Sequence, residues 1–283
     1  MKSFLKKIIP KTLRDYIYFL RIRGFKRQAL YTYLSLIQRF HFKVDSVVKV
    51  SLRGETISFP LSQKANVAQR FVKNGQSIAE LISFSKLCER KSCLLDVGAA
   101  QGIFSVVFAS FSKSGSALAV EPAESMISQL DETFELHGGQ RLRAVGVALG
   151  KLKGTSSFTA YGDGQIRMSK ATADNRPEIE TDTMDAFLEA SGFSPDLVKI
   201  DVEGFELDVV EGGVRFLTEC SPTLFMEIHP DILKSEGIAL LELKLRSLDY
   251  EIYDLNGNIV SDLKRFCSTL RDSPNVGHVI CEK

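Results

Sequence analysis

The sequence lacks the features of several classes of protein. Its apolar runs all fall short of the roughly 20 residues that a helix needs to cross a bilayer. The N-terminus has no uninterrupted apolar stretch followed by a small-residue cleavage site, and the chain shows no internal repeat and no low-complexity tract. We therefore expect neither a membrane-spanning protein nor a secreted one.

Cysteine is sparse and has no motif. The five cysteines are an odd number, are widely spaced and contain no CxxC pair. Two of them, Cys93 and Cys281, lie inside apolar runs that are typical of buried strands. These features favour a reducing, cytoplasmic setting.

Net charge is almost absent from the whole chain but is unevenly distributed along it. The formal net charge is +1, yet residues 1–43 contain eleven Lys or Arg and one acid. Apolar residues recur at helical spacing between these basic residues, which predicts a basic amphipathic helical extension over residues 1–45. Residues 1–43 could contact the inner face of an anionic membrane peripherally, or form a solvated cap or a dimerisation arm. The acidic remainder of the chain argues against a nucleic-acid partner.

Two further regions follow the extension. A connector over residues 46–75 contains two strand-like segments around Arg53-Gly54, which predict a β-hairpin. Residues 76–283 form the predicted catalytic domain, in which strand and helix patterns alternate. Strands are predicted at 92–97, 116–121, 142–147, 196–201, 222–228, 249–254 and 277–282, and helices near 76–90, 102–112, 122–136, 205–217 and 231–247. This alternation predicts an α/β fold with a mostly parallel sheet and helices on both faces.

The segment 150–180 departs from this pattern. It is rich in Gly, Ser, Thr, Asp and Lys and has little periodicity. We expect it to be a surface excursion or a lid near the active site.

The turn from Asp96 to Gly102 lies where the first strand of this domain enters a helix, the usual ligand position in a doubly wound sheet. We expect Gly98 to let the backbone approach a ligand, Gly102 to allow close packing of the next helix, and Asp96 to meet a cationic amine. Ala100 stands where a dinucleotide fingerprint has its second glycine. The turn therefore argues against a dehydrogenase that uses NAD.

An acid ends the next predicted strand. Glu121 follows Asp96 by 25 residues, and an acid at this place accepts hydrogen bonds from two ribose hydroxyls. Either feature by itself could be ordinary loop chemistry. Together they predict a nucleoside ligand that carries an ammonium and a sulfonium instead of phosphates.

A second group of acids follows later strands. Asp201, Glu203 and Glu206 come directly after the predicted strand 196–201, where acids would face the ligand cleft. Glu227 and His229 lie at the end of the next strand, two residues apart, so that both should project to the same side. The sequence therefore predicts a polar site at this end of the sheet.

The ordered motifs resemble the FkbM-type methyltransferase family over roughly residues 70–282. The motifs are Asp96–Ala99, Val120–Pro122, Ala148–Gly150, Lys199–Glu206 and Glu227–His229, of which Lys199–Glu206 is the most specific. The resemblance implies the Rossmann-like fold of class I methyltransferases, with a seven-stranded sheet and S-adenosylmethionine as methyl donor. It also implies O-methylation of a sugar, a glycan or a small natural product.

The resemblance further implies a set of cofactor-binding residues. Asp96, Gly98 and Gly102 would hold the methionine end, Glu121 the ribose, and Asp201 would lie beside the methyl-transfer site. The family usually has Asn where this chain has Ala100, and Gln101 is the nearest amide that could replace it. Ala148 offers no acidic side chain to adenine, which would be bound by backbone groups and packing.

Methyl transfer to oxygen requires an aligned acceptor and the removal of its proton. We predict Asp201, Glu203 and His229 as catalytic residues, with His229 as the base because its ordinary pKa of about 6.5 suits this task. Alternatively, Asp201, Glu227 and His229, together with Glu203, form a divalent-metal site that orients a diol. In a purely structural interpretation, Lys199 pairs with Glu203 or Glu227, and His229 caps the following helix.

The remaining candidates have structural or rival interpretations. Glu206 is expected to bond backbone amides near a helix start. His278 is expected to be a surface or core residue without acidic companions. The rival function is a catalytically inactive, nucleoside-binding or membrane-associated relative of the same fold, and Ala100 is the residue that favours it.

Overall fold

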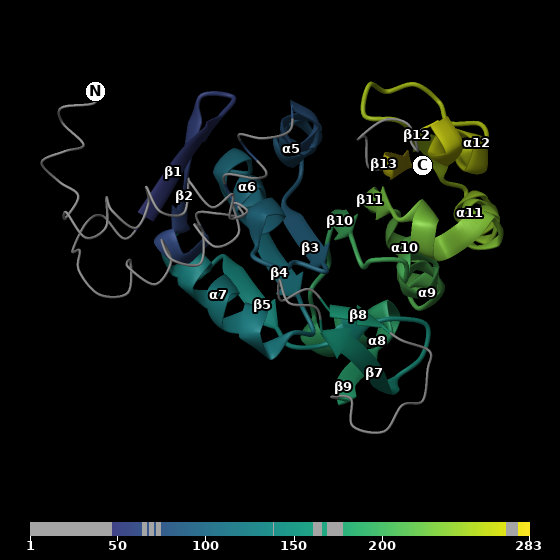
Figure 1. Cartoon of the computed structure of the whole chain (residues 1–283), viewed down its shortest axis with the longest axis horizontal. Coiled ribbons are helices and arrows are strands. Elements are labelled where there is room, and N and C mark those ends of the chain that lie inside the picture. Colours follow the sequence, from purple (N-terminus) through teal and green to yellow (C-terminus); the bar gives the residue numbers. More distant parts are fainter. Residues whose placement is uncertain are drawn as a thin grey trace, which may run out of the picture. The chain divides into compact units, whose positions relative to one another are not determined.

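The structure is a computed structural model that describes residues 47–63, 67, 71, 75–137, 139–160, 166–168, 178–269 and 277–283. The extension predicted over residues 1–45, with its membrane contact, lies outside the described residues. Val47–Lys283 form one compact unit, and its described residues are drawn in colour in Figure 1.

A seven-stranded sheet forms the centre of this unit. Its order is β12 (Glu251–Tyr253), β13 (Gly277–Glu282), β11 (Thr223–Ile228), β10 (Leu197–Ile200), β3 (Cys93–Val97), β4 (Ser116–Val120) and β5 (Leu142–Val145). Neighbouring strands are parallel, except that β13 runs antiparallel to both β11 and β12. The predicted α/β fold with a mostly parallel, seven-stranded sheet is confirmed.

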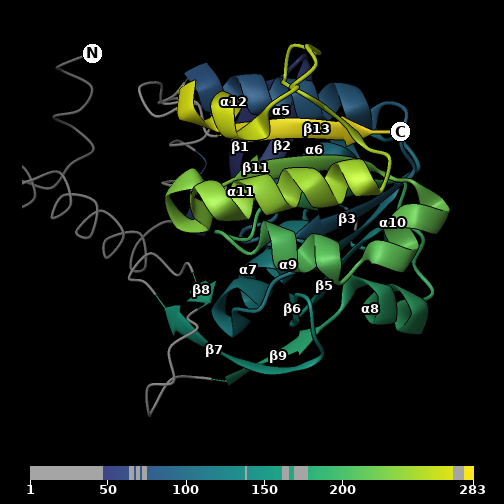
Figure 2. The same ribbon diagram turned by 90° about the vertical axis from the view of Figure 1, so that its right-hand side faces the viewer.

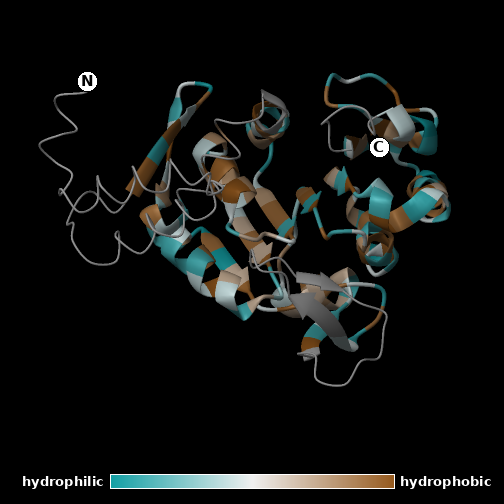
Figure 3. Cartoon of the chain, viewed as in Figure 1, coloured by the Kyte–Doolittle hydropathy of each residue, from teal (hydrophilic) through white to brown (hydrophobic). Residues whose placement is uncertain are grey.

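Helices cover both faces of the sheet because alternate side chains of each buried strand point to opposite sides. Leu95 and Val97 of β3 join one apolar core, whereas Leu94 joins the other. One core is covered by α8 (Met184–Ser191), α9 (Glu206–Glu211), α10 (Val214–Cys220), α11 (Pro230–Ser247) and α12 (Leu263–Thr269), and the other by α5 (Gly75–Cys88), α6 (Ile103–Phe111) and α7 (Glu124–Glu135). Figure 2 shows α9, α10 and α11 in front of the sheet, and Figure 3 shows its central strands mostly in the brown of apolar residues.

The predicted hairpin is present and packs on this fold. Strands β1 (Val47–Leu52) and β2 (Glu55–Pro60) pair antiparallel and precede the short helix η1 (Leu61–Gln63). Arg53 and Gly54 have φ of 50° and 88°, the two positive values that a type I′ hairpin turn requires. Ile57 and Phe59 are fully buried in the core that includes α5 and α6. The hairpin is therefore part of the same packed unit as the sheet.

The segment predicted as an irregular excursion contains strands. A second sheet has the order β6 (Ala148–Leu149), β9 (Glu178–Asp182), β7 (Gly154–Ala160) and β8 (Ile166–Met168). Strand β7 is rich in Gly, Ser and Thr and β9 in acids, so they lack the alternation of apolar residues by which a half-buried strand is recognised, and β6 and β8 are very short.

The single helix predicted over 205–217 is two helices. The chain breaks between α9 and α10 at Gly212 and Gly213. A Cβ on Gly212 would lie 2.0 Å from the carbonyl oxygen of Gly150, so the chain can pass here only without a side chain. Helices α8 and α12 were not predicted.

Candidate active site

The glycine turn, which is residues 96–102, connects β3 to α6. The amides of Gly98 and Ala99 donate to the carbonyl of Val120 at 2.9 and 3.2 Å, which fixes the turn against the end of β4. Gly98, Ala100 and Gly102 have φ of 74°, 48° and 78°, all in the left-handed region. Left-handed backbone is costly for any residue with a Cβ, so Ala100 is the strained member of the three.

Close packing explains the two glycines of this turn. A Cβ on Gly98 would lie 1.9 Å from the backbone oxygen of Asp201. A Cβ on Gly102 would lie 2.8 Å from Leu130 and 2.9 Å from Phe134, both on α7. The side of Gly98 that lacks a Cβ faces the chain that leaves β10, and that of Gly102 makes room for α7. The expected approach of the Gly98 backbone to a ligand stays a prediction.

Glu121, directly after β4, ties the glycine turn to the start of α7. Its carboxylate accepts hydrogen bonds from the amides of Ala100 and Ala123, each at 2.9 Å. Burial raises the pKa of Glu121, and these two hydrogen bonds together with the charge of Lys199 oppose the increase. The carboxylate lies beside the turn, and its role toward a ribose stays a prediction.

Asp96 is turned into the protein. Its side chain is fully buried, accepts a hydrogen bond from the Ser105 hydroxyl at 2.7 Å and pairs with the Lys199 ammonium at 3.1 Å. Lys199 also donates to the carbonyl of Gly98 at 2.6 Å. The cation that meets Asp96 is therefore a lysine of the same chain, and the geometry does not support the direct contact with a ligand amine that the sequence predicts.

Lys199 also reaches toward the second polar group of the site. Its ammonium lies 3.7 Å from Asp201 Oδ2. The buried strand β10 places this lysine between Asp96 on β3 and the residue that follows β10 itself. The structure thus gives Lys199 an acidic partner, Asp96, that the sequence interpretation did not consider.

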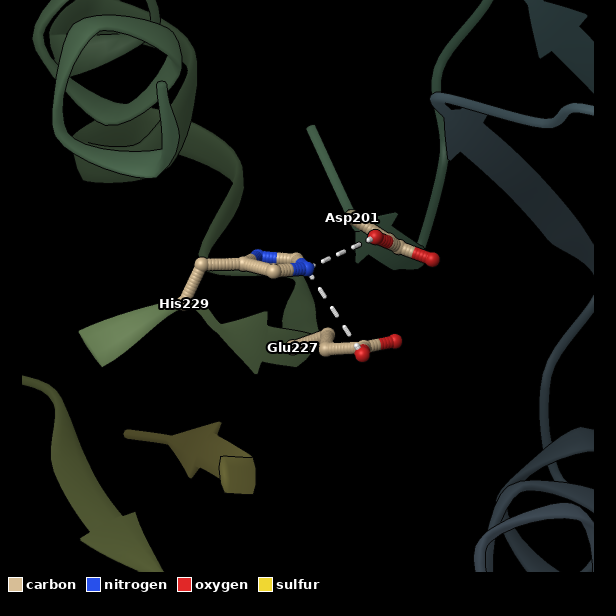
Figure 4. A group of neighbouring side chains, drawn as sticks. All are labelled: Asp201, Glu227 and His229. Atoms are coloured by element: carbon tan, nitrogen blue, oxygen red, sulfur yellow. Dashed lines mark ion pairs between the residues drawn. The ribbon is translucent and has the colours of Figure 1, made fainter. Parts of the chain in front are cut away.

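The acidic cluster, which we define as Asp201, Glu203, Glu227 and His229, gathers at the carboxyl ends of β10 and β11. These strands are parallel neighbours, so the residues at their ends meet. His229 Nε2 lies 3.8 Å from Asp201 Oδ1 and 3.7 Å from carboxylate oxygens of both Glu203 and Glu227. Figure 4 shows Asp201 and Glu227 on one side of the imidazole, facing the same ring nitrogen.

The opposite ring nitrogen of His229 is held by Glu206. Nδ1 donates to Glu206 Oε1 at 2.7 Å, and the same oxygen accepts from the amide of Gly204 at 2.9 Å. His229 occupies the N-cap position of α11, with Pro230 next, but its side chain makes no capping hydrogen bond. The capping interpretation of His229 is therefore wrong, whereas the expected bond from Glu206 to a backbone amide is confirmed.

The surroundings of His229 change its protonation. Burial lowers its pKa, but the hydrogen bond and charge of Glu206, with the charges of Asp201 and Glu227, outweigh burial and raise the pKa from 6.5 to about 9. The ordinary value that suggested a base at neutral pH does not hold in this environment.

His278 was missed as a member of this region. The antiparallel register of β13 sets it opposite Glu227, and its Nε2 lies 3.3 Å from Glu227 Oε2 and 3.2 Å from Glu80 Oε2 on α5. Burial lowers the pKa of His278, but its interactions with Glu227 and Glu80 raise it above the ordinary value. The expectation that His278 has no acidic companions is wrong. Only the placement of the last strand beside β11 could have revealed the pair.

The other predicted positions are placed less informatively. Gln101 is half-buried in the glycine turn, and Ala148 is buried in β6, so their roles toward a cofactor stay predictions.

All five cysteines are described, and none of them forms a disulfide. Among the described residues, no helix is long and apolar enough to span a membrane.

The comparisons with known proteins identify the family. The family model of the methyltransferase FkbM domain matches residues 96–252, more than half of the chain. The search of curated proteins found no match to this chain. Similar solved structures include an FkbM methyltransferase from Methylobacillus flagellatus (14% identity, TM-score 0.44, 79% of this chain and 58% of that one). They also include the TYW2 protein of M. jannaschii in complex with AdoMet (13% identity, TM-score 0.40, 86% of this chain and 87% of that one). A third is the fibrillarin pre-rRNA processing protein of Methanococcus jannaschii (12% identity, TM-score 0.44, 86% of this chain and 84% of that one). The family match over residues 96–252 shows that the chain belongs to the FkbM methyltransferase domain family.

Proposed function

We propose that this protein transfers a methyl group from S-adenosylmethionine to a hydroxyl oxygen of a sugar, a glycan or a small natural product. Family membership supports methyl transfer. The observation that carries the proposal is the arrangement at one edge of the sheet, where buried Glu121 adjoins the glycine turn and the acidic cluster follows β10 and β11. S-adenosylmethionine supplies a methyl group on a positively charged sulfonium.

The residues of the glycine turn fit a nucleoside. Each oxygen of the Glu121 carboxylate accepts one backbone amide, and a carboxylate oxygen has a second lone-pair site for a ribose hydroxyl. Asp96 contributes indirectly, by holding Lys199 against the carbonyl of Gly98. The chain thus offers an acid and a shaped turn without a phosphate-binding fingerprint.

The acidic cluster fits the acceptor side of the reaction. Asp201 adjoins the glycine turn through its backbone, which approaches Gly98, and its side chain faces His229. We assign to Asp201, Glu203 and His229 the binding of the acceptor hydroxyl, and to the carboxylates among them the removal of its proton, because His229, with a pKa of about 9, already holds a proton near neutral pH. A negative cluster also suits the neighbourhood of a sulfonium, because opposite charges attract.

Calorimetry of the full chain with S-adenosylhomocysteine and with NAD tests the cofactor. We expect sub-millimolar binding of S-adenosylhomocysteine and none of NAD. If neither ligand bound at sub-millimolar concentration, the methyltransferase proposal would fail.

Turnover tests the acceptor side. The assay measures release of S-adenosylhomocysteine from S-adenosylmethionine over a panel of hydroxylated sugars and small natural products. We expect Asp201→Asn and His229→Ala to abolish release while circular dichroism still reports a folded chain. Wild-type turnover in His229→Ala would remove this residue from the mechanism.

Ala100 favours a second candidate function, that of a catalytically inactive relative which binds the nucleoside only. It holds a left-handed conformation, with φ of 48°, that costs alanine more than asparagine. Binding of S-adenosylhomocysteine without turnover on any acceptor of the panel would favour this candidate over the enzyme.

A further inference from the structure

We propose that Asp201, Glu227 and His229 bind a divalent cation, Mg²⁺ or Mn²⁺, and that this ion positions the acceptor hydroxyl. The role of the ion rests on the proposed methyl transfer, whereas its binding rests on the geometry of the cluster alone. The three residues each direct one potential ligand atom toward a common point, and these atoms all lie within 4.8 Å of one another.

The separations suit an ion better than direct contacts. His229 Nε2 is 3.8 Å from Asp201 Oδ1 and 3.7 Å from Glu227 Oε1, which is longer than a hydrogen bond. Around an ion with bonds of about 2.1 Å, ligand atoms are about 3 Å apart when adjacent and about 4.2 Å apart when opposite. The observed separations fall between these two values, so small side-chain shifts bring all three atoms into coordination.

A second observation is independent of these distances. Each of the three residues has its other polar atom engaged by a more deeply buried side chain, the outer-shell support that orients metal ligands in proteins. The pairs are His229 Nδ1 with Glu206 Oε1 at 2.7 Å, Glu227 Oε2 with His278 Nε2 at 3.3 Å, and Asp201 Oδ2 with Lys199 Nζ at 3.7 Å. Glu206, His278 and Lys199 have almost no exposed surface. The support fixes which atom of each ligand faces the common point.

The charges and ligand types select the ion. Acids outnumber bases around the common point, because Glu80, Glu203 and Glu206 add their charges to those of Asp201 and Glu227. The two carboxylates suit Mg²⁺ or Mn²⁺, and the imidazole favours Mn²⁺ of the two because Mg²⁺, like Ca²⁺, takes oxygen ligands. Three protein ligands leave positions in a six-coordinate shell for water and for acceptor oxygens.

The ion gives the acceptor site a chemical function. A hydroxyl bound to a divalent cation loses its proton more readily. Its proton passes to the Glu203 carboxylate, whose oxygen lies 3.7 Å from His229 Nε2. The hydroxyl oxygen then forms a bond to the methyl carbon as the sulfur–carbon bond breaks and its electron pair returns to sulfur. The acceptor class that fits is a sugar or a similar molecule with adjacent hydroxyls, which can chelate the ion.

Titration of Mn²⁺ tests the binding without any need for turnover. The full chain is freed of metal with a chelator, exchanged into chelator-free buffer and titrated, while electron paramagnetic resonance measures free Mn²⁺. We expect one saturable Mn²⁺ per chain, competition by Mg²⁺, and at least about tenfold weaker binding in Asp201→Asn and in Glu227→Gln. The matched control is Glu135→Gln, an exposed acid at the end of α7, which should bind as the wild type does.

Three results would overturn the cation site: no saturable binding by the wild type, wild-type affinity in Glu227→Gln, or an equal loss in Glu135→Gln. If Asp201→Asn fails to fold, the Mn²⁺ affinities of the wild type and of Glu227→Gln still test the cation site. Calorimetry with S-adenosylhomocysteine separates the two proposals. If the protein binds S-adenosylhomocysteine but does not bind Mn²⁺, the cation site is excluded and the methyltransferase proposal stands. If it binds Mn²⁺ but does not bind S-adenosylhomocysteine, the cation site is supported and the methyltransferase proposal fails.

Discussion

The glycine turn and the acidic cluster lie at the same edge of one sheet but are constructed differently. In the turn, backbone amides and carbonyls make the contacts, and the two acids face inward toward Ser105, Lys199 and backbone amides. In the cluster, side-chain atoms converge on His229. The geometry of the glycine turn therefore depends on glycines that lack a Cβ, whereas the geometry of the acidic cluster depends on the balance between its negative and positive charges.

Lys199 joins the two regions, and its replacement is the largest change we expect. Lys199→Met leaves the fully buried Asp96 without its cation, which should lower the free energy of unfolding by about 3–5 kcal/mol. Urea denaturation measures the loss, and the double variant with Asp96→Asn should recover part of it. Additive losses in the double variant would contradict the pairing.

Gly98→Ala should disturb both regions at once. The new Cβ would collide with the backbone of Asp201 and would force alanine to adopt a φ of 74°, at a cost of about 3 kcal/mol of unfolding free energy. Gly257→Ala is the matched control, because Gly257 has φ of 85° with nothing within 4 Å of its added Cβ. Equal losses in the two variants would show that the close approach to Asp201 has no energetic weight.

Glu121→Ala should affect the glycine turn alone. The amides of Ala100 and Ala123 lose their acceptor, and calorimetry should find S-adenosylhomocysteine bound about tenfold more weakly, which is about 1.4 kcal/mol. Affinity for Mn²⁺ should not change. Glu124→Ala, an exposed acid in the first turn of α7, serves as the control and should keep the wild-type nucleoside affinity.

His278→Gln should affect the acidic cluster alone. It removes the imidazole that holds Glu227, so binding of Mn²⁺ should weaken by about tenfold while that of S-adenosylhomocysteine stays unchanged. A change in nucleoside affinity, or none in Mn²⁺ affinity, would contradict the separate construction of the two regions. Thermal unfolding followed by circular dichroism verifies that the buried site tolerates the substitution.

Ala100→Asn should have the smallest effect and the opposite sign. Asparagine tolerates left-handed backbone better than alanine, so the variant should gain up to about 1 kcal/mol of unfolding free energy, or a few degrees in Tm. Ala100 is only half-buried, so the larger side chain can extend toward solvent. An unchanged or lower Tm would show that the turn is not strained at this position.

Periodicity predicted the main elements of the sheet but not the partners of its polar side chains. Apolar runs indicated all seven strands because burial imposes a pattern that neighbouring residues share. The pairs of Lys199 with Asp96 and of His278 with Glu227 join residues that are far apart in sequence, and they depend on strand order and register. The small sheet of β6 to β9 was missed because its strands are short and their sequences lack a sustained alternation of apolar and polar residues.

The position of β13 affects the order in which the glycine turn and the acidic cluster form during synthesis. This strand is inserted between β11 and β12, although it follows both in the sequence. During synthesis the glycine turn, Asp201 and His229 emerge well before His278, and contacts between distant segments form slowly. The glycine turn can therefore take shape on a growing chain, whereas Glu227 gains its contact with the buried His278 only when β13 enters the sheet.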